Sequence, residues 1–311
     1  MCSFCNQHTI SGAVKAPSAD EVRKTCSEAY GYIKDRSRCE IAFFGGSFTA
    51  VPEKYRTDLL ESVQEFISED GFCGIRISTR PDCIDRKILE ELKKYHVTAI
   101  ELGCQSMDDE VLRLNERGHS AEDVVKASQL IREYGFELGH QMMTGLYGSS
   151  PEKDSYTADR IISLKPDTVR IYPVVILEGT KLADLYRSGV YEVYSLDEMV
   201  DCCTDYMERF TENGIRIIKC GLHASETVEG EMTGGYYHPA FRELCESRHY
   251  RNLLDGLLRE QGEYRIEVRP ELVSKVTGQK RSNIDYFSLK GIKIKVVSSV
   301  QKEELNVFKI T

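Results

Sequence analysis

The chain has 311 residues, of which 41% are hydrophobic, and this share is enough to bury a sizeable core, which argues against a disordered protein. The sequence contains no run near 18 apolar residues and no basic start followed by an apolar run, so it indicates neither a membrane span nor a secretory signal. A net charge of −9 gives no general attraction to nucleic acid. Eleven irregularly spaced cysteines are typical of free thiols in a reducing compartment, so we expect a cytoplasmic protein.

Short apolar strands alternate with amphipathic helices through most of the chain. Strands are expected, in chain order, at residues 41–44, 75–77, 99–102, 136–143, 168–172 and 215–218. Helices are expected between them at about 20–36, 54–69, 84–95, 120–134, 151–164 and 195–213. Ser120 with Asp123 predicts a capping box at one helix start, and Gly135 and Gly214 predict two helix ends. This order predicts parallel strands joined by right-handed helical crossovers.

The alternation predicts an α/β fold that closes into a barrel or partial barrel. Active sites in such folds gather at the carboxyl ends of the strands. Polar side chains occupy the ends of the predicted strands, namely Ser47, Thr79, Arg80, Glu101, Gln105, Gln141, Arg170 and Tyr172. This pattern favours a site for a polar cofactor, although loops are polar in general and that explains some of these positions.

The alternation weakens from about residue 230. A helix near 240–260 and alternating strands at 264–268 and 292–296 predict a small α+β appendage. We therefore expect a barrel in residues 1–228 and the appendage in residues 229–311. Residues 263–311 contain ten Lys or Arg against six Asp or Glu, so a local basic patch remains open.

The chain begins Met1-Cys2-Ser3-Phe4-Cys5, and its Cys-x-x-Cys spacing has three interpretations. Zinc needs four ligands, and no second pair of Cys or His follows at a suitable spacing. A thioredoxin-like redox site needs a strand ahead of the motif, and none precedes it. Iron–sulfur ligation is the third interpretation, and the spacing alone does not decide among them.

Cys2-Ser3-Phe4-Cys5 resembles the last two cysteines of the Cys-x-x-x-Cys-x-x-Cys motif of the radical S-adenosylmethionine (SAM) superfamily, with the aromatic residue before the final cysteine. The resemblance implies that Cys2 and Cys5 are ligands of a 4Fe-4S cluster that also binds SAM. The first cysteine of the motif falls four residues before Cys2. We therefore expect a start assigned too late or a truncated chain, with Met1 inside the motif and the first barrel strand missing.

Two further motifs extend this resemblance. Phe44-Gly45-Gly46-Ser47 is similar to the glycine segment that holds the methionine amine of SAM in the superfamily, and this implies a cofactor role for Gly45, Gly46 and Ser47. The segments at 101–106, 117–120 and 139–146 resemble the catalytic subunit of Elongator and, more distantly, oxygen-independent coproporphyrinogen oxidase. That resemblance implies that Gln105, Arg117 and Gln141 contact SAM. Glu101 is a weaker candidate, because it can instead pair with Arg76 or Arg80.

The resemblance implies a radical SAM enzyme with a partial (β/α)6-type barrel that generates a 5′-deoxyadenosyl radical. Its partners are expected to be SAM, a reductant protein such as a flavodoxin or ferredoxin, and either a tRNA or a small-molecule substrate, with no membrane. We expect the acetyltransferase domain of the Elongator subunit to be absent, so the resemblance does not extend to the acetyl-CoA-dependent reaction of that protein. Two alternatives remain, namely a barrel that has lost its cluster and serves as a binding scaffold, and a zinc-dependent hydrolase.

Overall fold

A computed structural model of the chain describes residues 2–6, 9, 15–223, 225–300 and 303–310. Met1, which the sequence places inside the cluster motif, lies outside these ranges. None of the described helices is both long enough and apolar enough to cross a lipid bilayer.

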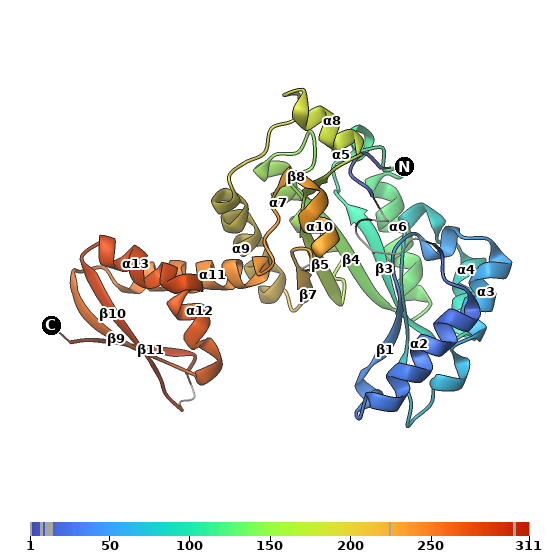
Figure 1. Ribbon diagram of the computed structural model, residues 1–311, viewed down its shortest axis with the longest axis horizontal. Coiled ribbons are helices and arrows are strands. Elements are labelled where there is room, and N and C mark those ends of the chain that lie inside the picture. The colour runs from blue at the N-terminus through green and yellow to red at the C-terminus, as the bar shows by residue number, and fades with distance from the viewer. Residues whose placement is uncertain (1, 7–8, 10–14, 224, 301–302, 311) are drawn as a thin grey trace.

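The main body is a curled sheet of six parallel strands in the order β1-β2-β3-β4-β5-β7 (Figure 1). The strands are β1 (Glu40–Phe43), β2 (Gly74–Thr79), β3 (Val97–Gln105), β4 (Glu137–Thr144), β5 (Thr168–Pro173) and β7 (Arg216–Cys220). The helices of the main body are α2 (Ala19–Tyr32), α3 (Glu53–Glu61), α4 (Arg86–Lys94), α5 (Asp109–Leu114), α6 (Ala121–Glu133), α7 (Pro151–Ser163), α8 (Lys181–Arg187) and α9 (Leu196–Glu212). This architecture confirms the partial α/β barrel that the sequence predicts.

Local signals explain where several helices begin and end. The Ser120 side chain accepts a hydrogen bond from the backbone N–H of Asp123, and the Asp123 carboxylate accepts one from the backbone of Ser120, so the predicted capping box forms. Gly135 and Gly214 follow α6 and α9 with φ angles of 77° and 72°, which glycine adopts at low cost. The predicted helix at 54–69 is shorter, because α3 ends at Glu61 and a 3₁₀ turn follows at Gln64–Phe66.

Sequence patterns missed the shorter elements. β6 (Val175–Leu177) pairs with β8 (Met232–Gly235) in an antiparallel two-stranded sheet, and α10 (Glu226–Glu231) precedes β8. The pattern of residues 234–239 predicts a loop, but Gly234 and Gly235 belong to β8, which is held by pairing with a distant segment that local propensity does not reveal.

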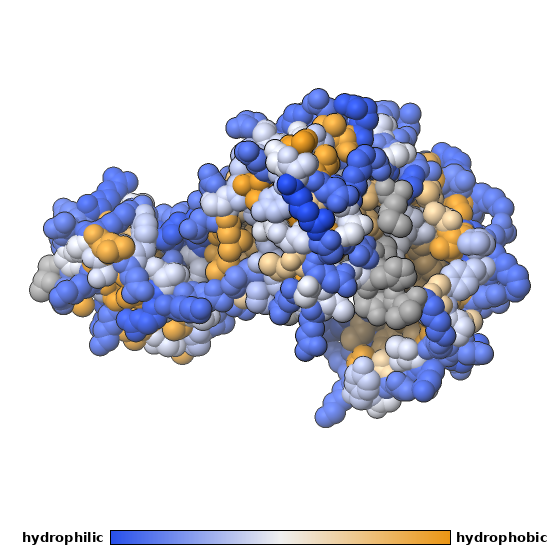
Figure 2. All heavy atoms as spheres, turned by 45° about the horizontal axis from the view of Figure 1, so that its top comes forward, coloured by the Kyte–Doolittle hydropathy of each residue, from blue (hydrophilic) through white to orange (hydrophobic). Residues whose placement is uncertain are grey.

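A second lobe follows the main body and projects from it, at the left of Figures 1 and 2. It contains the end of α11 (Phe241–Leu257), β9 (Gly262–Val268), α12 (Val273–Thr277), α13 (Ser282–Leu289), β10 (Ile292–Ser298) and β11 (Leu305–Lys309). Helix α11 joins the two lobes, because Phe241 and Cys245 belong to the core of the main body whereas Tyr250 and Leu254 belong to a separate core. The boundary expected after residue 228 stays a prediction.

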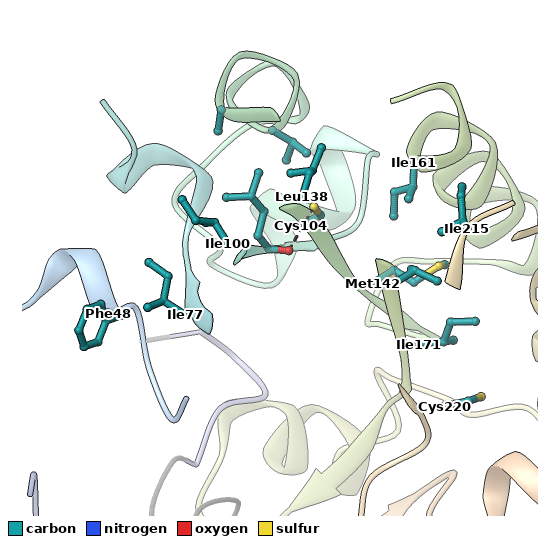
Figure 3. Packing of buried hydrophobic residues seen from close by; sticks show 14 of the residues in the cluster. Phe48, Ile77, Ile100, Cys104, Leu138, Met142, Ile161, Ile171, Ile215 and Cys220 are labelled. Carbon is teal, nitrogen blue, oxygen red and sulfur yellow. Dashed lines mark hydrogen bonds between the residues drawn. The ribbon is translucent and has the colours of Figure 1, made fainter. Parts of the chain in front are cut away.

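Side chains alternate across the main sheet, as the period of a strand requires. The apolar side chains face the outer helices, and Figure 3 shows Ile77, Ile100 and Ile171 on the strands with Ile161 of α7. The opposite, concave face carries Arg76, Glu101, Gln141 and Arg170, which are polar or charged. The half-barrel is therefore apolar toward its helices and ionic on its inside.

His140 on β4 is fully buried among the apolar residues of the outer face. Its Nε2 lies 2.9 Å from the Ser128 hydroxyl of α6, and its Nδ1 has no hydrogen-bond partner in the described part of the chain. Burial lowers the pKa of His140 to about 3, so the ring is neutral at physiological pH.

We expect His140 to make the fold acid-sensitive. Because its folded pKa lies below the ordinary value, its contribution is complete above about pH 6.5 and is lost as the pH falls toward 3. Between pH 6.5 and 5 this amounts to about 2 kcal/mol in the free energy of unfolding. Urea denaturation at several pH values should show a shallower acid decline for His140→Gln than for the parent. The exposed His223, changed to Gln, serves as the control, and equal slopes for parent and His140→Gln would contradict the assignment.

Candidate functional site

The loop with Cys2 and Cys5 lies against the carboxyl end of β3. Its backbone turns so that the Cys5 N–H donates to the Cys2 carbonyl at 3.2 Å. The Ser3 hydroxyl and the Ser3 N–H donate to the side chain and the carbonyl of Asn115, at 2.9 and 3.1 Å. Asn115 is completely buried at the end of α5, and the Ser3 carbonyl in turn accepts from the N–H of Leu182. The cysteine loop is therefore held on both sides by the barrel.

Arg117 connects this loop to β3. One terminal nitrogen of its guanidinium lies 3.1 Å from the Cys2 sulfur, and the other donates to the Gly103 carbonyl at 2.7 Å. The ring of Phe4 lies 5.9 Å from the guanidinium carbon. The arrangement puts a fixed positive charge beside a thiol that the sequence predicts to be a metal ligand.

Gln105 and Arg117 are two predicted cofactor residues that both lie beside Gly103 of β3. Gln105 ends β3 with a left-handed φ of 65°, a conformation that a non-glycine residue seldom adopts. A Cβ on Gly103 would lie 2.9 Å from the Gln105 amide nitrogen and 3.3 Å from Arg117, so both side chains lie close to the backbone of Gly103 and a larger residue would displace their ends. These three residues form one compact group.

Two buried polar atoms of this group lack partners. Gln105 Oε1 and Arg117 Nε are both buried and make no hydrogen bond within the described residues. Unpaired buried polar atoms are costly and call for a missing partner. One atom accepts and the other donates, so together they fit a ligand that offers both a hydroxyl and a carboxylate, as the ribose and methionine parts of SAM do.

The glycine segment lies at the end of neighbouring β1. Gly45 has a left-handed φ of 108°, Gly46 has open space where a side chain would be, and both are exposed. Ser47 is half-buried, and the Gly46 carbonyl accepts from the Ser78 hydroxyl of β2 at 3.4 Å. The backbone at Gly45 and Gly46 is therefore open to a ligand.

Glu101 is the centre of a buried ionic network on the concave face. Its side chain is 1% exposed, and its two oxygens accept from Arg170 at 2.6 and 3.0 Å. Arg76 lies 3.5 Å away, and the Gln141 amide donates to Glu101 at 2.9 Å. Of the two arginines that the sequence suggested, Arg76 is a partner, whereas Arg80 pairs with Asp82. The assignment of Glu101 and Gln141 as cofactor contacts stays a prediction.

Arg170 extends this network to the glycine segment. Its guanidinium carbon lies 4.9 Å from the centre of the Phe44 ring, and Phe44 immediately precedes Gly45. The sequence placed Arg170 at a strand end but assigned it no role. Neither Phe44 nor Asn115 was identified, because their contacts are long-range and no local pattern signals them.

His119 is buried beside Arg117, and its Nε2 lies 3.2 Å from the Cys104 carbonyl. Burial, followed by the charge of Arg117, lowers the pKa of His119 to about 4. The ring is therefore neutral at physiological pH, so it adds no second positive charge to the site.

The side chains that could ligate a metal supply only part of the predicted cluster site. Within the described ranges, no three His, Cys, Asp or Glu side chains are grouped so as to hold a metal ion. Cys2 and Cys5 supply two thiols of the kind that iron–sulfur clusters require, and the third cysteine of the superfamily motif has no counterpart in the described part of the chain. The residues present thus fit part of a cluster site and the SAM site beside it.

We expect Glu101→Ala to destabilise the fold strongly. The substitution leaves Arg170 and Arg76 as like charges with their shared buried carboxylate removed, which should lower the free energy of unfolding by about 3 kcal/mol. Chemical denaturation provides the measurement. Glu122→Ala, which breaks only an exposed pair with Lys126, should leave the midpoint unchanged. An equally small effect of Glu101→Ala would show that the network contributes nothing.

Known proteins are similar to this chain in sequence and in fold. The Radical SAM superfamily matches residues 1–160, and the Radical_SAM C-terminal domain matches residues 166–251. A tRNA uridine(34) acetyltransferase of Methanocaldococcus infernus is 38% identical over 194 residues, which are 56% of this chain and 36% of that protein. Elongator complex protein 3 of Schizosaccharomyces pombe is 30% identical over 185 residues, which are 53% of this chain and 34% of that protein.

A solved structure of archaeal Elp3 from Methanocaldococcus infernus, with residues 1–46 deleted, superposes with a TM-score of 0.57 and 26% identity. The superposition covers 68% of this chain and 57% of that one. The chain spans about a third of the length of the two curated relatives. The family match and the fold agree, and the chain belongs to the radical SAM superfamily.

Proposed function

We propose that this protein is a radical SAM enzyme that binds a 4Fe-4S cluster and SAM at the carboxyl ends of β1 and β3. The observation that carries the proposal is the pair of unpartnered buried atoms, Gln105 Oε1 and Arg117 Nε, because Arg117 also contacts the Cys2 sulfur through a terminal nitrogen. When bound, the reduced cluster would supply the electron that cleaves SAM to methionine and a 5′-deoxyadenosyl radical.

Each residue has a specific part in this proposal. Cys2 and Cys5 would hold two irons, in a loop that Asn115 keeps against β3. Gln105 and Arg117 would bind the ribose and the carboxylate, because an amide pairs with hydroxyls and a guanidinium pairs with a carboxylate. The exposed backbone of Gly45, Gly46 and Ser47 would receive the methionine amine. Gln141 would contact SAM from the concave face of the sheet, where Glu101 orients its amide.

The substrate proposal rests on the relatives. Their names include a tRNA uridine acetyltransferase and Elongator complex protein 3, and these favour a nucleoside in tRNA over a small molecule. Electrons would come from a reductant protein such as a flavodoxin or ferredoxin, and we propose a cytoplasmic location. The acetyl transfer named for the relatives is not proposed here, since the chain spans about a third of their length.

Anaerobic reconstitution tests the cluster. The chain, produced together with any residues that its gene encodes upstream, should take up iron and sulfide and release 5′-deoxyadenosine from SAM when a strong reductant is added. Cys5→Ser should abolish both the bound iron and the product, because it removes one cluster thiolate. Cys73→Ser, which changes an exposed cysteine, is the control. Absence of iron with retained SAM binding would favour a cluster-less binding scaffold, and stoichiometric zinc without sulfide would favour a hydrolase.

Binding of SAM tests the two side chains independently of turnover. We expect Arg117→Ala and Gln105→Ala each to weaken SAM binding about tenfold or more, since each removes a hydrogen bond to a polar or charged ligand group in a buried site. Equilibrium dialysis with labelled SAM measures this. Arg113→Ala, on the exposed face of α5, should bind like the parent. Parent-like affinity in both site variants would remove these residues from the SAM site.

A further inference from the structure

The second lobe has a fold of its own, in which a strand, two helices and a second strand follow one another. β9 and β10 pair in parallel, β11 pairs with β9 on its other side in the antiparallel sense, and α12 and α13 both pack beside β10. Its core contains Ile266, Val276 and Phe287, none of which is exposed. The turn between α12 and α13, residues 278–281, lies on the surface of this lobe.

This turn has an unusual backbone. Gly278 begins it with a φ of 80°, and an added Cβ would lie 2.5 Å from the Ser282 hydroxyl, so no other residue fits. Lys280 and Arg281 then have left-handed φ angles of 52° and 68°. Two consecutive non-glycine residues in this region are strained, and strain of this kind persists only where neighbouring structure holds it.

The buried Asn283, just after the turn, fixes its backbone through hydrogen bonds. It is 2% exposed, and its amide nitrogen donates to the carbonyls of Ser247 on α11 and Val276 on α12, at 2.9 and 3.1 Å. The Arg281 N–H closes the turn by donating to the Gly278 carbonyl at 2.9 Å. The turn is therefore rigid, and it presents the side chains of Lys280 and Arg281 to solvent.

These two cations differ from most others of the lobe. Six Lys or Arg side chains pair with carboxylates, namely Arg265–Glu267, Arg269–Glu271, Lys275–Glu246, Lys290–Asp255, Lys293–Glu263 and Lys309–Glu260. Lys280 and Arg281 form no ion pair with any described residue, and Asp285, one helical turn later, is the next acidic side chain in the sequence. Their charge is thus available to an external anion.

We propose that the turn at 278–281 binds the phosphate backbone of single-stranded RNA, and so delivers an RNA substrate to the radical site. KH modules clamp nucleotide backbone with a GXXG loop, and the turn Gly278-Gln279-Lys280-Arg281 shares the first glycine and the length of that loop, with Arg281 in place of the second glycine. Lys280 and Arg281 form no ion pair with a described residue, and their positive charges match the negative charge of such a ligand. This inference rests on the proposed function, since it names the substrate class of the same enzyme.

The open face of the lobe's sheet is the less favourable surface. Phe308 is 44% exposed there, but the Arg265 guanidinium already covers it at 5.3 Å, and Lys293 is paired with Glu263. Binding at the sheet would have to break these pairs, whereas binding at the turn breaks none.

The experiment replaces both cations with aspartate, which tolerates left-handed backbone better than most residues, in the variant Lys280→Asp with Arg281→Asp. The probe is a fluorescein-labelled single-stranded RNA of about 12 nucleotides, and its fluorescence anisotropy is measured with the full-length protein in air, without a cluster. We expect at least about a tenfold loss of affinity. The slope of log affinity against log salt should fall by about 1.4, or about 0.7 for each lost phosphate contact.

The control carries the same charge change on the sheet of the same lobe, in Lys293→Asp with Lys309→Asp, and it should bind RNA within about twofold of the parent. Circular dichroism checks that both proteins fold. If the aspartate variant does not fold, Lys280→Asn with Arg281→Asn removes the charge while keeping a residue that tolerates this backbone. The proposal is overturned if the turn variant binds like the parent, if the control loses as much affinity, or if an RNA duplex binds as tightly as the single strand. Because the assay needs no cluster, failure of iron uptake leaves its result unaffected.

Discussion

The half-barrel depends on the burial of one carboxylate, that of Glu101. A curled sheet of parallel strands has an inner face that its outer helices do not cover, and here that face is ionic. Glu101 joins Arg76 of β2 to Arg170 of β5 across two intervening strands, while Gln141 of β4 completes its hydrogen bonding. A buried charge is tolerable only when it is paired and hydrogen-bonded in this way. The same contacts hold neighbouring strands at a common register where the predicted ligand would bind.

The ionic network of Glu101 and the contacts around Gly103 position the residues of the candidate site. Arg170 pairs with Glu101 and also lies against the ring of Phe44, the residue before the glycine segment. Arg170 therefore links the ionic network of Glu101 to the exposed backbone at Gly45. On the other side of β2, Gly103 gives Gln105 and Arg117 room to meet, and Arg117 reaches the cysteine loop. Arg117 places a positive charge beside the thiol, and Gln105 Oε1 and Arg117 Nε are among the buried polar atoms without a hydrogen-bond partner in the described residues. Such residual polarity is what a site for a charged cofactor requires.

Charge is distributed unevenly between the two lobes. The whole chain is acidic, yet residues 263–311 have more basic than acidic side chains, and six of these basic side chains pair with carboxylates. Helix α11 contributes side chains to both cores, and Arg248, 8% exposed, pairs with Asp197 and Asp201 of α9. These contacts connect the terminal lobe to the main body. A ligand bound at the turn of residues 278–281 would therefore be attached to the main body through α11.

The sequence by itself determined the alternation of strands and helices, the capping box at Ser120 and the helix ends at Gly135 and Gly214, because these depend on neighbours a few residues apart. It also indicated the family, because the glycine, glutamine and arginine motifs and their order along the chain can be read from the sequence alone. Only the tertiary structure decided that Asn115 anchors the cysteine loop, that Glu101 pairs with Arg170, and that β6 pairs with β8. Those contacts join residues far apart in the chain, and their energies depend on burial and distance, which no local pattern contains.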